Sequence, residues 1–132
     1  MIFTGIYKVQ PDKLNRIVLP KSFRKFILEA GEILYVRPAE NYFIAAPEIS
    51  LQNLLEHTAP GRPDDEIIRE KRRRILASVK QLHMDPQGRI KITFMTEMNE
   101  SSLLMLVGTG GDFEIWDRTL FVNTYPDLEG DE

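Results

Sequence analysis

The sequence predicts a mainly β protein with helices, an α+β fold, built from two similar halves. The first observation is a pattern that occurs twice, at Asp12 to Arg16 and at Asp85 to Arg89: an Asp, three further residues, and an Arg that opens a short apolar strand. The second is that the surroundings repeat as well, since segments 34–36 and 39–44 resemble segments 105–107 and 110–115. With 132 residues and 42% apolar content, the chain can build one core. We therefore expect two halves that close one core around an approximate two-fold axis.

Each copy of the pattern predicts a strand, a tight turn and a second strand. Asn15 and Gly88 stand just before the Arg of their copies, and both residue types tolerate a left-handed backbone. Asp12 and Asp85 are expected to accept hydrogen bonds from turn amides and so to hold the turn rigid. Strands are predicted over 1–9, 16–19, 33–37 and 42–46, and over 79–84, 89–92, 103–107 and 113–116.

Helices are predicted between and after these strands. Apolar residues from Pro20 to Gly31 have helical spacing, and further helices are expected over 48–57, over 65–78 and from 117 to Pro126. The helices over 48–57 and 65–78 each have an apolar side to bury. The second of these helices begins with acidic residues and ends with Arg72, Arg73 and Arg74. The helix dipole explains this order, and a basic nucleic-acid patch is the alternative. We divide the single domain into a first repeat over 1–59, a linker and inter-repeat helix over 60–78, a second repeat over 79–123 and an acidic tail over 124–132, which is expected to fray.

Composition and motifs argue against several classes of protein. The formal charge is −3, but residues 1–25 carry six cations against the single acid Asp12. The chain has no Cys, and neither His57 nor His83 lies in a metal-binding or catalytic pattern. We therefore expect no metal, no cofactor, no small-molecule substrate and no enzymatic activity. Without an apolar run of membrane-spanning length or a leader, the protein is expected to be cytoplasmic and not membrane-bound.

The paired turns, together with Leu106-Val107-Gly108 and the run from Phe113 to Trp116, resemble the MraZ family over roughly residues 1–122. The resemblance implies a duplicated AbrB/MraZ-type swapped-hairpin β-barrel with flanking helices. It implies a sequence-specific DNA-binding transcriptional regulator of the division and cell-wall gene cluster, including its own gene. Such proteins form rings of identical subunits on promoter repeats at the nucleoid. The chain departs from the family at Asn15, where Gly is usual, at Thr93, where Pro is common, and in segment 94–98, which is less like a helix.

Within this resemblance, Arg16 and Arg89 are expected to enter the major groove, because the planar guanidinium can bind a guanine edge through two donors. Further cations are expected to contact phosphates or support these turns: Lys13, Lys21, Arg24 and Lys25 with Arg16, and Lys91 with Arg89. Because the first group is larger, we predict that the first turn carries more of the affinity for double-stranded DNA. The alternative for each Arg is an ion pair with the Asp of its own turn.

A second function remains open from the sequence. In it, the chain is a ring-forming assembly module with weak or lost DNA binding. The amphipathic helices and the exposed-looking Leu14, Phe94 and Met95 would then be buried against other subunits.

Overall fold

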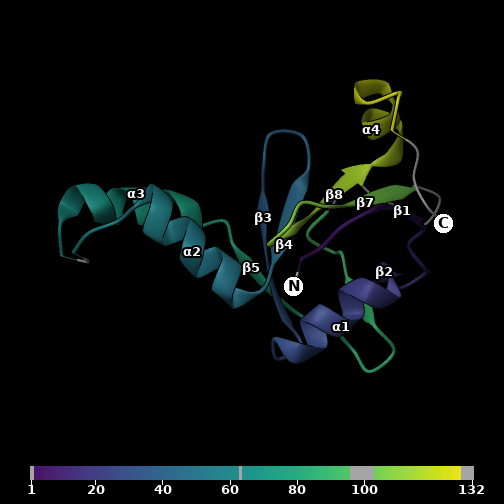
Figure 1. The fold of residues 1–132 in the computed structure, drawn as a ribbon, viewed down its shortest axis with the longest axis horizontal. Helices are drawn as coiled ribbons and strands as arrows, with labels where there is room; N and C mark the ends of the chain where they lie inside the picture. Colours follow the sequence, from purple (N-terminus) through teal and green to yellow (C-terminus); the bar gives the residue numbers. More distant parts are fainter. Residues whose placement is uncertain (1, 63, 96–102, 129–132) are drawn as a thin grey trace.

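The fold is α+β, as predicted. The computed structural model describes residues 2–62, 64–95 and 103–128 (Figure 1). The strands are β1 (Ile6–Val9), β2 (Arg16–Val18), β3 (Ile33–Pro38), β4 (Phe43–Ala46), β5 (Lys80–His83), β6 (Arg89–Lys91), β7 (Leu104–Gly108) and β8 (Phe113–Asp117). The helices are α1 (Lys21–Glu29), α2 (Glu48–Thr58), α3 (Glu66–Leu76) and α4 (Arg118–Thr124).

The strand order has an internal two-fold symmetry. A six-stranded antiparallel sheet has the order β1-β7-β8-β4-β3-β5, and β2 and β6 form a second sheet. Exchanging each strand for its counterpart in the other half simply reverses this order. Since β1 pairs with β7 and β5 pairs with β3, each half supplies an edge strand to the other. The intertwining of the two halves is therefore confirmed, while the domain boundaries stay a prediction.

The barrel does not close within the described residues. β1 and β5 are the two edges of the larger sheet, and the β2–β6 pair stands apart from it. The two sheets and α1 instead enclose a common core to which Ile17, Phe23, Ile90 and Phe113 contribute fully buried side chains. Phe23 and Phe113 lie 4.9 Å apart between ring centres, so α1 is joined to the large sheet through aromatic packing.

The helices differ in how they pack. α2 lies against β3 and β4 with Leu51 buried, whereas α3 extends to one side of the sheets (Figure 1) and has no buried residue. Ile67 on α3 is 70% exposed, so this helix does not bury its apolar side within the single chain. Its first turn is as expected, because the Asp65 side chain accepts hydrogen bonds from the amides of Ile67 and Ile68.

Two residues expected to be exposed belong to the core instead. Met95 is 8% exposed, and the Phe94 ring packs edge-on against Phe43 with ring centres 5.1 Å apart. Leu14 is exposed, as predicted. The rest of segment 94–98 and the end of the acidic tail lie outside the described residues. No helix in the described ranges is both long and apolar enough to cross a membrane.

Candidate nucleic-acid interface

The β2–β6 pair is a short two-stranded ribbon with one apolar and one basic face. Ile17 lies opposite Ile90, and both are buried in the core. Because side chains alternate along a strand, the neighbouring positions face the other way. There Arg16 lies opposite Lys91, and Val18 lies opposite Arg89. The core therefore anchors the ribbon through its isoleucines, and three cations share the opposite face.

The turns that precede the two ribbon strands have the same geometry. Asp12 Oδ1 accepts hydrogen bonds from the amides of Leu14 and Arg16, both at 2.9 Å. Asp85 Oδ1 accepts from the amides of Gln87 and Arg89, also at 2.9 Å. Each turn thus has the aspartate-held form that the sequence suggested.

Each turn contains one residue with a left-handed backbone. Asn15 has φ +57° and Gly88 has φ +78°, directly before the respective Arg. These are the positions at which the sequence placed its turn-formers. A β-branched residue would be strained at either of them.

Each arginine is also held by the Asp of its own turn. Arg16 Nε lies 2.8 Å from Asp12 Oδ2, and Arg89 Nε lies 2.7 Å from Asp85 Oδ2. The ion pair weighed as an alternative to base contact is therefore present at both turns. The carboxylate contacts Nε of the guanidinium and not its two terminal Nη atoms. The ion pair therefore orients the guanidinium without occupying both terminal nitrogens. In the second turn, Nη2 of Arg89 also donates to Gln87 Oε1.

The same contacts keep both aspartates ionised. Partial desolvation alone would raise the pKa of Asp85, but hydrogen bonds from the amide and guanidinium of Arg89 and from the Gln87 amide outweigh it and lower the pKa below its ordinary value. The pKa of Asp12 is lowered in the same way by Arg16 and Leu14, again against desolvation.

Both turns open onto one surface of the molecule. Arg16, Arg89 and Lys91 line a shared hollow of about 370 Å³, whose remaining wall includes Gln81 and His83 from β5. The arginine side chains are equally exposed, at 25% each. Two arginines on the same face of one ribbon form a single basic surface. His83, which showed no functional pattern in the sequence, lies at its border.

The cations are not grouped as the sequence suggested. Lys21, Arg24 and Lys25 on α1 line a hollow of about 740 Å³ together with Asp85 and Gly88 of the second turn. Lys91, which was assigned to the second turn, lies opposite Arg16 of the first. The predicted grouping is therefore wrong, because antiparallel pairing places the end of β2 beside the start of β6.

Lys13 is exposed and belongs to the same turn as Arg16. The cations beside the first turn are therefore Lys13 and Lys91. The second turn has the three cations of α1.

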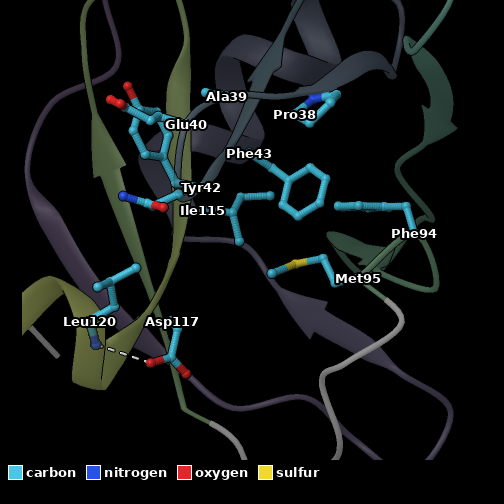
Figure 2. Close-up of a pocket in the computed structure, with 11 residues that line it drawn as sticks. Pro38, Ala39, Glu40, Tyr42, Phe43, Phe94, Met95, Ile115, Asp117 and Leu120 are labelled. Atoms are coloured by element: carbon cyan, nitrogen blue, oxygen red, sulfur yellow. Dashed lines mark hydrogen bonds between the residues drawn. The ribbon is translucent and has the colours of Figure 1, made fainter.

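Another hollow, of about 470 Å³, lies away from the ribbon between the β3–β4 hairpin, Phe94, Met95 and the start of α4 (Figure 2). Phe43, Phe94, Met95 and Ile115 point toward one another in it. Its two carboxylates, Glu40 and Asp117, lie at opposite ends, and Asp117 caps α4 by accepting a hydrogen bond from the Leu120 amide at 3.0 Å. The hollow is thus an apolar groove whose carboxylates do not converge.

Comparisons with known proteins show which family the chain resembles. A family profile described as "MraZ protein, putative antitoxin-like" matches residues 75–128, which include the second turn. A protein of Nitratidesulfovibrio vulgaris named transcriptional regulator MraZ is 26% identical over 126 residues, covering 92% of this chain and 84% of that protein. Over most of its length the chain is therefore similar to proteins named transcriptional regulator MraZ, and residues 75–128 match the MraZ family profile.

Further MraZ relatives match nearly the whole chain. The transcriptional regulator MraZ of Alcanivorax borkumensis is 22% identical, with 98% of this chain and 89% of that protein covered. The protein of the same name from Mycolicibacterium smegmatis is 25% identical over 88% of this chain and 81% of its own length. All of these relatives are named as transcriptional regulators, and none is named as an enzyme.

Proposed function

We propose that this protein is an MraZ-type, sequence-specific DNA-binding regulator whose β2–β6 ribbon enters the major groove. The observation that carries the proposal is the pair of arginines, Arg16 and Arg89, each held through Nε by the Asp of its own turn on one face of the ribbon. The major groove admits a two-stranded ribbon, and a fixed guanidinium fork matches the O6 and N7 acceptors of guanine. Arg16 and Arg89 would read bases, while the aspartates, which phosphates repel, would only hold the arginines in place.

The targets follow from the family. The expected sites are repeats in the promoter of the division and cell-wall gene cluster, which includes the protein's own gene. Acting there would place the protein at the nucleoid in the cytoplasm.

Chemical footprinting tests the base contacts directly. Dimethyl sulfate methylates guanine N7 in the major groove, so a bound arginine fork should protect that atom. We expect the wild-type protein to protect guanines in a duplex from upstream of its own gene, and Arg16→Ala and Arg89→Ala each to lose part of that protection. Lys71→Gln on α3 removes a cation remote from the ribbon and should leave the pattern unchanged. Full wild-type protection in both arginine variants, or no protection with the wild-type protein, would refute groove entry by the ribbon.

We extend the proposal to a homo-oligomeric ring, since α3 leaves an apolar side uncovered. Ile67 is 70% exposed and Leu76 is 40% exposed, and Ile49 on α2 is 62% exposed. Linked subunits would multiply weak contacts to repeated sites through effective concentration, which suits a chain whose formal charge is −3. Light scattering at micromolar concentration should give a multiple of the 15.3 kDa chain mass. Ile67→Asp should reduce that mass, and a monomeric wild type would exclude the ring.

A further inference from the structure

We propose that α1 and the Asp85–Arg89 turn form one composite DNA-binding unit. In it, Lys21, Arg24 and Lys25 bind backbone phosphates beside the base that Arg89 contacts. The inference rests on the proposed function and specifies which half of the interface carries the phosphate contacts. It predicts that the second turn carries more of the DNA affinity than the first, the reverse of what the sequence order suggests.

The pairing of β2 with β6 puts α1 at the second turn. In an antiparallel pair, the end of one strand lies beside the start of the other. The Leu19 amide, just after β2, donates to the Gly88 carbonyl at 2.9 Å. The chain turns into α1 at Pro20, whose carbonyl accepts from the Arg24 amide at 3.0 Å. The start of α1 is therefore held next to the second Asp-to-Arg turn by a backbone hydrogen bond.

Arg24 joins the helix to this turn. Its side chain lies so close to Gly88 that a Cβ atom there would be 1.9 Å from Arg24 Cδ and 3.0 Å from Nε. Its Nε is buried and has no hydrogen-bond partner in the part of the chain that the structure describes. Within that part, no carboxylate forms an ion pair with Arg24, so the guanidinium charge stays available to an anion. Arg24 is thus both a phosphate ligand and a positioning residue for the turn.

Lys21 and Lys25 complete the cationic wall. Both are exposed and line the hollow of about 740 Å³ that α1 shares with Asp85, Pro86 and Gly88. The hollow has two lining carboxylates, but Asp85 is already engaged by Arg89, which leaves Glu32 as the opposing charge. Three lysine and arginine side chains around one turn are an arrangement that phosphate oxygens can satisfy and that fixes the register on the duplex.

The first turn has a different neighbour at the equivalent place. The end of β6 lies beside it, since the Ile92 amide donates to the Asn15 carbonyl at 2.8 Å. Thr93, Phe94 and Met95 follow and carry no charge, and the last two pack in the core. The asymmetry thus arises because the segment after β2 is a basic helix, whereas the described segment after β6 is neutral.

A double-mutant cycle tests the composite unit. Binding of the full chain would be measured by fluorescence anisotropy, with a duplex from upstream of its own gene and a scrambled duplex, at several salt concentrations. Lys25→Gln and Arg24→Gln should each weaken binding to both duplexes and reduce the slope of log K against log salt by about one. In an Arg89→Ala background their fold-losses should shrink by about threefold or more, because the turn beside them no longer docks.

The matched control is Lys13→Gln on the first turn. Its effect should shrink in an Arg16→Ala background and persist in Arg89→Ala. Arg24→Lys keeps a charge at the same helix position and should retain most of the salt slope. Melting temperatures would show whether each variant is folded.

The outcomes separate the two proposals. Coupling of Lys25 and Arg24 with Arg16 in place of Arg89, or equal coupling with both, would overturn the composite unit and leave the regulator intact. If Arg16→Ala and Arg89→Ala both left the preference for the upstream duplex unchanged, the proposed function would fail together with this inference. Coupling with Arg89 alone would support both.

Discussion

Substitution of Gly88 by alanine tests the contact between α1 and the second turn. Two costs are expected in the free energy of unfolding. Alanine at φ +78° adopts a left-handed backbone, which costs about 1–2 kcal/mol. Its Cβ would also lie 1.9 Å from Arg24 Cδ, so the arginine stem must leave the turn. We take about 1 kcal/mol for that displacement, at the low end of overpacking costs, because the arginine side chain can rotate away.

Gly110→Ala is the matched control. Gly110 has φ +94° in the turn between β7 and β8, and a Cβ there would meet nothing within 4 Å. It should therefore cost only the backbone strain of about 1–2 kcal/mol, against about 2–3 kcal/mol for Gly88→Ala. Urea denaturation would measure both, in the wild-type chain and in an Arg24→Ala background. The excess at Gly88 should vanish without Arg24. If Gly88→Ala cost more than Gly110→Ala by the same amount in both backgrounds, the Arg24 side chain would not pack against the turn.

Three further predictions concern the ribbon and its turns. Because Asn15 has φ +57°, Asn15→Gly should leave the free energy of unfolding unchanged or raise it, whereas Asn15→Val should lower it by about 1–2 kcal/mol. Urea denaturation would measure both variants. Because the folded-state pKa values of Asp12 and Asp85 are lowered, the stability that they provide should be fully present above their ordinary pKa and lost as the pH falls through the folded-state values. The melting temperatures of D12N and D85N should therefore depend less on pH in the acid range than that of the wild type. Ile90→Ala should cost about 2–5 kcal/mol in urea, while the exposed Val18→Ala should stay within about 0.5 kcal/mol; equal costs would mean that the ribbon is not anchored by its isoleucines.

Local features could be predicted from the sequence because their causes are local. Asn15 and Gly88 stand at the two left-handed turn positions, and the turn-capping aspartates are each followed at the fourth position by an Arg that they hold. The strands beginning at Arg16 and Arg89 also start where predicted. In each case, residue type and spacing decide the conformation within a few residues.

Features that depend on pairing between distant segments could not be predicted in the same way. The sequence places Lys21, Arg24 and Lys25 close to Arg16, but the antiparallel register of β2 and β6 brings them to Gly88 and moves Lys91 to Arg16. A repeat shows that two halves are alike without showing how they exchange strands. The burial of the α3 apolar side was left open for a related reason, since an apolar helix face does not reveal whether its partner lies in the same chain.

Relative affinity of the arginine variants for specific and scrambled DNA tests the central claim most directly. Anisotropy titrations would compare wild type, Arg16→Ala, Arg89→Ala and the double variant on the duplex from upstream of the protein's own gene and on its scrambled form. If the ribbon arginines read bases, each single variant should lose about 1–3 kcal/mol of specific binding, and the double variant should bind both duplexes alike. A double variant that kept the wild-type preference for the upstream duplex would contradict base recognition by the ribbon.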